Sequence, residues 1–117
     1  MLFGKKDIYE KIASLAEKGH LGKLLNIAQI NGEEEVRIAA YKAIGNLHAK
    51  EAVEHLLAVF RTDEVPEVKL AAADALSRIA TKAEFDAMFH AADNESDERV
   101  AKALRDAAVE AKERQKY

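Results

Sequence analysis

The sequence repeats itself at an interval of 32 residues. Residues 36–44 (VRIAAYKAI) return at 68–76 as VKLAAADAL, and a weaker copy, VAKALRDAA, occupies residues 100–108. A fixed period of this size is typical of a stacked-repeat protein, in which each unit buries its apolar face against its neighbours. The chain is therefore expected to fold as a stack of similar units.

Composition indicates that these units are helical. The chain has 117 residues with only one Pro and five Gly, and Ala, Leu, Ile, Glu and Lys dominate. These are helix-forming residues, so we expect an all-α fold in one domain. Because the chain has no Cys, disulfides, thiolate metal sites and cysteine nucleophiles are excluded.

Two apolar stripes at helical spacing occur in each copy, which predicts two helices per unit. In the first copy the second stripe consists of Val36, Ala39, Ala40, Ala43, Ile44 and Leu47. Pro66 suits a first helical turn, and Thr81 with Glu84 has the spacing of a capping box. The predicted helices span residues 7–18, 21–29, 33–47, 50–61, 66–80, 82–92 and 97–115.

The phase of the stripes divides the single domain, 1–117, into unequal units. We expect a half repeat at 7–18, repeat 1 at 21–47, repeat 2 at 50–80 and repeat 3 at 82–116. In the third copy most positions of the stripe are alanine, and the helix ends in charged residues. This unit is therefore expected to be a C-terminal cap. The apolar start, Met1 to Phe3, has no such polar cover, and it is a candidate surface for a homodimer through the N-terminal end.

The segment VRIAAYKAIGNL at residues 36–47 resembles the second helix of HEAT repeats, in the short form named after the phycobilisome lyases. The resemblance extends over nearly the whole chain, although Ser77 stands where the first copy has Gly45. It implies a right-handed α-solenoid of about three and a half helical hairpins. In such a superhelix the second helices line the concave side and bind another macromolecule.

The side of each second helix opposite the apolar stripe is the candidate binding surface. Tyrosine and branched apolar residues there provide contact area, and basic residues set charge preference. The predicted partner is a helix or an extended peptide of another protein. The partner-binding residues are predicted to be Tyr9, Arg37, Ile38, Tyr41, Lys42, Lys69, Leu70 and Ala73. The alternative is that Ile38, Leu70 and the tyrosines pack between adjacent repeats as part of the core.

The sequence does not support catalysis, and no cofactor or metal is predicted. The four His do not form the paired helical motifs that a metal site needs, since His55 has only Ala58 and Val59 at the i+3 and i+4 positions. No glycine-rich phosphate loop is present. The Ser residues also lack a neighbouring base that would activate a nucleophile.

Charge and hydropathy limit the partners further. With 18 Lys+Arg against 21 Asp+Glu, the net charge of -3 gives no general attraction for nucleic acid or for anionic lipid. The chain shows neither a signal peptide nor an apolar run long enough to span a bilayer, so a cytoplasmic location is predicted. Two other functions stay open: an accessory subunit of a chromophore lyase or related modifying enzyme, and a structural homo-oligomer.

Overall fold

A computed structural model describes residues 5–114, and within this range the chain forms seven α-helices and no β-strand. The helices are α1 (Lys5–Glu17), α2 (Leu21–Ile30), α3 (Glu34–Leu47), α4 (Val53–Thr62), α5 (Pro66–Ile79), α6 (Phe85–Asp93) and α7 (Glu98–Arg114). The predicted all-α class is confirmed. The final residues of the predicted last helix and cap, and the apolar start from Met1 to Phe3, lie outside the described residues.

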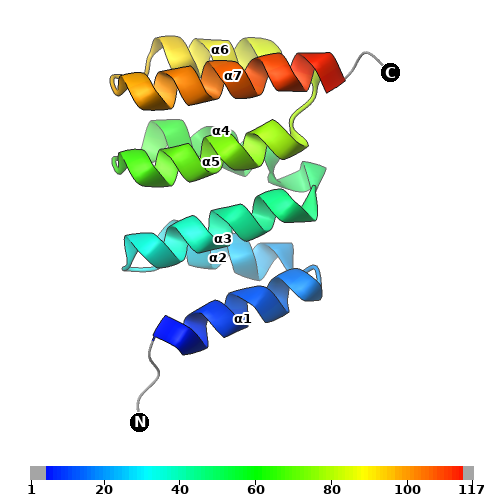
Figure 1. Cartoon of the computed structure of the whole chain (residues 1–117), viewed down its shortest axis with the longest axis vertical. Coiled ribbons are helices and arrows are strands. Elements are labelled where there is room, and N and C mark those ends of the chain that lie inside the picture. The colour runs from blue at the N-terminus through cyan, green and yellow to red at the C-terminus, as the bar shows by residue number, and fades with distance from the viewer. Residues whose placement is uncertain (1–4, 115–117) are drawn as a thin grey trace.

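The helices form two layers (Figure 1). α1, α3, α5 and α7 lie side by side in one layer, which we call the front layer, and α2, α4 and α6 lie behind it. Within each 32-residue copy the two helices pack on one another, as α2 does on α3 and α6 on α7. The stack measures 48 × 32 × 16 Å along its principal axes.

Two of the predicted helices begin differently from expectation. The predicted helix 50–61 starts with a 3-10 turn, η1 (Lys50–Ala52), and the predicted helix 82–92 starts with another, η2 (Lys82–Glu84). In each turn a backbone N–H bonds three residues back, from Ala52 to the Ala49 carbonyl and from Glu84 to the Thr81 carbonyl. These short-range bonds tighten the entry to α4 and α6.

The helix ends follow local sequence signals. The predicted capping box is present, because the Thr81 hydroxyl accepts from the Ala83 N–H and the Glu84 carboxylate accepts from the Thr81 N–H at 2.7 Å. Pro66 occupies the first turn of α5. His48 ends α3 in the left-handed region with φ 54°, and its Nδ1 lies 3.2 Å from the Arg78 carbonyl of α5.

The core lies between the two layers and is continuous along the stack. It includes Val36, Ala40 and Ile44 of α3, which are at most 1% exposed, together with their counterparts in α5. α2, α4 and α6 contribute leucine, valine and methionine to the same cluster. In the stripe predicted for residues 36–47, Val36, Ala40 and Ile44 are therefore core, whereas Ala39, Ala43 and Leu47 are only half-buried.

Candidate functional site

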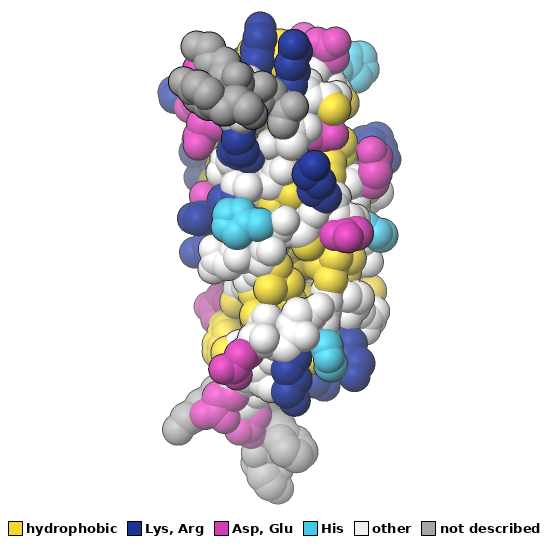
Figure 2. Space-filling view, turned by 90° about the vertical axis from the view of Figure 1, so that its right-hand side faces the viewer, with side chains coloured by type: hydrophobic (Ala, Val, Ile, Leu, Met, Phe, Trp, Pro, Cys, Tyr) yellow, Lys and Arg dark blue, Asp and Glu magenta, His cyan; other side chains and the backbone are white. Residues whose placement is uncertain are grey.

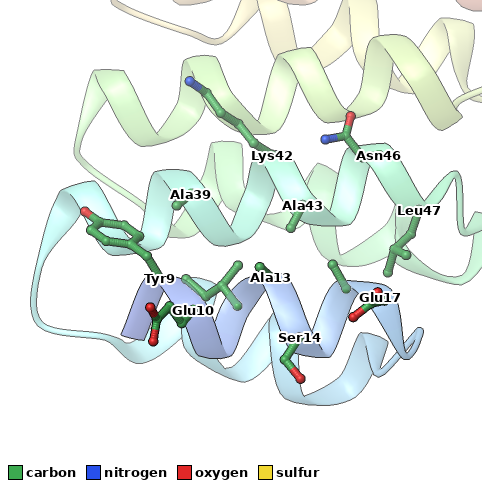
Figure 3. Close-up of a pocket in the computed structure, with 12 residues that line it drawn as sticks. Tyr9, Glu10, Ala13, Ser14, Glu17, Ala39, Lys42, Ala43, Asn46 and Leu47 are labelled. Atoms are coloured by element: carbon green, nitrogen blue, oxygen red, sulfur yellow. The ribbon is translucent and has the colours of Figure 1, made fainter. Parts of the chain in front are cut away.

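A groove lies in the front layer between α1 and α3 (Figure 3). Ala39, Ala43 and Leu47 point from α3 toward α1, and Ala13 points back from α1. The groove is shallow and open to solvent, with a volume of about 930 Å³. We call it the α1–α3 groove; its lining is Tyr9, Glu10, Ile12, Ala13, Ser14, Ala16, Glu17, Ala39, Lys42, Ala43, Asn46 and Leu47.

The groove exists because one flank of α3 is left partly uncovered. At the next junction of the front layer, α3 covers the equivalent residues of α5, so Ala71, Ala75 and Ile79 are 5%, 0% and 4% exposed. The corresponding residues of α3 face α1 and remain half-buried. The same three apolar positions are therefore buried at the α3–α5 junction, which we call closed, and partly accessible at the α1–α3 junction, which we call open.

The two junctions differ at one close-packed position. A Cβ added to Gly45 of α3 would lie 2.9 Å from the Ala75 Cα, so the close approach of α3 and α5 requires glycine at this position. The residue 32 positions earlier, in α1, is Ala13. Ala13 carries the Cβ that Gly45 lacks, so the α1–α3 contact has no glycine like the one that lies against α5.

The residue one turn earlier in each helix also differs in size. α3 carries Tyr41 one turn before its glycine, whereas α5 carries Ala73 one turn before Ser77. In α3 the small residue of this pair is Gly45, and in α5 both residues of the pair are small. α1 combines Tyr9 with Ala13, which is the bulkiest pair of the three.

Charged and polar side chains border the apolar floor of the groove. Glu10, Ser14 and Glu17 border it on α1, and Lys42 and Asn46 border it on α3. Within residues 5–114, neither the two carboxylates nor the Lys42 ammonium forms an ion pair. A ligand in the groove would therefore meet uncompensated charge on both rims.

The structure brings only two of the predicted site residues into this groove. Tyr9 is half-buried at one end of it and Lys42 is exposed on its rim. Ile38 and Leu70 are half-buried, and Ile38 packs against the core. For Ile38 the alternative interpretation as inter-repeat core is therefore closer to what the structure shows.

The expected exposure of Tyr41 and Ala73 is wrong. Each of these side chains is 1% exposed, because the next helix of the front layer covers this flank. Tyr41 lies beside the connection from α4 to α5 and near Arg37. Burial raises the pKa of its phenol, and the Arg37 charge opposes that shift.

Arg37 and Lys69 are engaged within the stack, contrary to the prediction that they face a partner. Arg37 forms an ion pair with Asp63 in the α4–α5 connection, and Lys69 Nζ lies 3.0 Å from Glu95 Oε1 in the α6–α7 connection. All four side chains are at most 15% exposed. Since Lys69 and Glu95 each follow their counterpart by 32 residues, the two ion pairs are the same contact made twice.

Sequence reasoning missed most of the groove. The apolar stripe predicts that Ala39, Ala43 and Leu47 are core, and no sequence pattern indicates a role for Ser14, Glu17 or Asn46. The difference between Ala13 and Gly45 does not by itself predict the open junction, because Ser77 also carries a Cβ at this position and the α5–α7 junction is closed, with Ala107 and Ala111 at most 2% exposed.

The described residues show no sign of a metal site or a membrane helix. Residues 5–114 contain no group of three or more His, Asp or Glu that could hold a metal ion, and no helix among them is long and apolar enough to cross a bilayer. Acidic and basic side chains are interspersed over the edge of the stack where α1, α3 and α5 end (Figure 2). On that edge no single sign of charge dominates.

Comparison with known proteins identifies the repeat. A model of the family described as HEAT repeats matches residues 21–109, which run from the start of α2 into α7. No curated protein and no solved structure matches the chain. The matched segment includes α3 and leaves out α1, so the groove lies at the edge of the recognised array.

Proposed function

The chain belongs to the HEAT-repeat family, and from this premise we propose that it is a non-catalytic module that binds another protein in the α1–α3 groove. The front layer is taken as the concave face of a right-handed α-solenoid of about three and a half repeats. The units proposed are 7–18, 21–47, 50–80 and 82–116, with the last acting as a cap. HEAT repeats commonly serve in protein interactions.

One observation carries the proposal: an apolar flank that is buried at the next junction is accessible at this one. Ala71, Ala75 and Ile79 are covered by α3, whereas Ala39, Ala43 and Leu47 are not covered to the same extent by α1. Apolar surface in a preformed hollow with a polar rim is the usual anatomy of a protein-binding site. The proposed contact residues are therefore Tyr9, Ala13, Ala39, Lys42, Ala43 and Leu47.

The test compares partner capture by wild type and by a variant with a filled groove. Ala13 is exposed and Ala43 is half-buried, so Ala13→Gln/Ala43→Gln adds polar bulk to the groove with a residue that favours helix. Ala83→Gln, at an exposed alanine of η2 far from the groove, is the matched control. All three proteins are first checked for equal helicity by circular dichroism.

We expect wild type and the control to retain from lysate of the source cells a protein that the groove variant does not retain. Equal capture by the three proteins would refute binding in the groove. Nothing in the structure favours the accessory lyase subunit or the homo-oligomer, and both stay predictions, as do the cytoplasmic location and the absence of a nucleic-acid partner. Light scattering on the purified chain tests the homo-oligomer.

A further inference from the structure

We infer that the α1–α3 groove receives an amphipathic α-helix of the partner protein, with its apolar face in the groove and a basic flank against α1. This inference rests on the proposed function and adds the chemistry of the partner. It depends on three features of the groove: the hydrogen bonding of its walls, the size of its floor residues, and the charge of its rims.

The walls favour a helix over an extended segment. Every lining residue lies inside α1 or α3, where the backbone N–H and C=O groups are used within the helices except for the last carbonyls of each helix. An extended peptide would find no main-chain partner there, because strand addition requires an open sheet edge. A helix satisfies its own backbone groups and presents only side chains.

The floor is shaped for large apolar side chains on the incoming helix. Ala13, Ala39 and Ala43 form a floor of single methyl groups between two roughly parallel helices, with Leu47 at one end. Small residues on one surface allow a neighbouring helix to approach within about 8–10 Å between axes. Leucine or phenylalanine at successive turns of the partner would fill the space that the alanines leave.

The rim of α1 is acidic, and the part of the chain that the structure describes provides no ion-pair partner for it. Asp7, Glu10 and Glu17 recur at helical spacing along one side of α1, and none of them pairs with a cation within the described chain. From Glu10 to Glu17 the rim rises about 10 Å, or two turns of a facing helix. Lysine or arginine at this spacing on the partner would compensate both carboxylates.

Two exposed carboxylates elsewhere in the front layer have partners in their own helices. Asp74 of α5 pairs with Arg78, and Asp106 of α7 pairs with Lys102 at 2.8 Å. Those carboxylates are neutralised within their own helices. On α3 the rim carries Lys42, which would repel a second basic flank, so the partner helix is expected to be basic on one side only.

Two synthetic helical peptides test the inference. Both are 16 residues long with leucines along one face and glutamines along one flank, and the other flank carries lysines in the first peptide and glutamates in the second. Binding of each labelled peptide is measured by fluorescence anisotropy at low salt. Glu10→Gln/Glu17→Gln removes the proposed acidic rim, and Glu51→Gln/Glu54→Gln makes the same charge change at exposed positions outside the groove.

We expect the lysine peptide to bind wild type about tenfold more tightly than the glutamate peptide, with a difference that shrinks as salt is added. The preference should disappear in Glu10→Gln/Glu17→Gln and persist in Glu51→Gln/Glu54→Gln, and both peptides should lose affinity for Ala13→Gln/Ala43→Gln. Equal affinities, or a preference that survives loss of the rim, would overturn the basic flank. If neither peptide binds, the inference of a helical partner is overturned. The proposed function would still hold if partner capture from lysate is lost in Ala13→Gln/Ala43→Gln.

Discussion

Gly45 of α3 lies against Ala75 of α5 so closely that a Cβ on Gly45 would stand 2.9 Å from the Ala75 Cα and 3.1 Å from its Cβ. A glycine in the interior of a helix normally costs stability relative to alanine. Here it permits two neighbouring helices of the front layer to approach. The contact closes the α3–α5 junction, whereas the α1–α3 junction, with Ala13 at the equivalent position, stays open.

Gly45→Ala should therefore destabilise the protein in spite of the better helix propensity of alanine. The gain in propensity is about 1 kcal/mol, and overpacking at a close contact costs about 1–3 kcal/mol, so we expect a net loss of about 1 kcal/mol in the free energy of unfolding. The control is Gly22→Ala in α2, where an added Cβ meets nothing within 4 Å. Urea denaturation should show the control to be neutral or stabilised. Equal stabilisation of both variants would contradict the proposed role of Gly45.

The ion pair between Arg37 and Asp63 should contribute measurably to stability, because their side chains are only 15% and 9% exposed. Arg37→Met leaves the Asp63 carboxylate without its partner and removes a donor from the Ala28 carbonyl, and we expect it to cost about 2 kcal/mol. A double-mutant cycle with Asp63→Asn should give a coupling energy of about 1–2 kcal/mol. The same cycle on the exposed Arg78–Asp74 pair should give less than about 0.5 kcal/mol. Coupling energies of equal size would show that burial does not strengthen the inner pair.

Tyr41 should make the fold sensitive to alkaline pH. Burial raises the pKa of its phenol in the folded state, so the folded chain holds this proton more tightly than the unfolded chain. The resulting stabilisation is complete below about pH 10 and is lost as pH rises through the folded pKa. As pH rises above that value, the melting temperature of Tyr41→Phe should fall less than that of wild type. The melting temperature of Tyr9→Phe should fall as much as that of wild type. Parallel curves for all three would contradict the assignment to Tyr41.

Asp97 should have the opposite effect, at acidic pH. Its side chain accepts hydrogen bonds from Arg99 and from the backbone N–H groups of Arg99 and Val100 at the start of α7, and these interactions lower its pKa. The stabilisation is present above about pH 4 and is lost as pH falls through the lower folded pKa. Asp97→Asn should therefore show a smaller fall in melting temperature between about pH 4 and pH 2 than wild type. Glu51→Gln, at an exposed site in η1, is the control and should follow wild type.

Features that depend on residues near one another in the chain were predictable. The 32-residue period predicted the helix pairs, and the capping box from Thr81 to Glu84 was predicted from spacing alone. The burial of Val36, Ala40 and Ile44 followed from their helical stripe. Each of these features is decided within one or two turns of helix, where the order of residues determines the geometry.

The expected exposure of the predicted binding residues was wrong at several positions for a physical reason. A helical projection separates the face toward the paired helix from the opposite face, but it does not show how far the neighbours in the stack cover the flanks. Tyr41 lies on such a flank and is buried by the next repeat. Arg37 and Lys69 lie on the same flank and reach acidic residues 26 positions later in the chain.

The sequence by itself determined the all-helical fold, the period of the stack and the apolar stripes, because helix formation and amphipathicity depend on local order. Only the tertiary structure decided which flank of each stripe stays accessible. That outcome depends on how closely helices about 30 residues apart can approach, and at the α3–α5 contact the approach requires the absence of one methyl group at Gly45. Close-packed interiors respond to differences of this size, so the position of the groove is a property of the assembled stack.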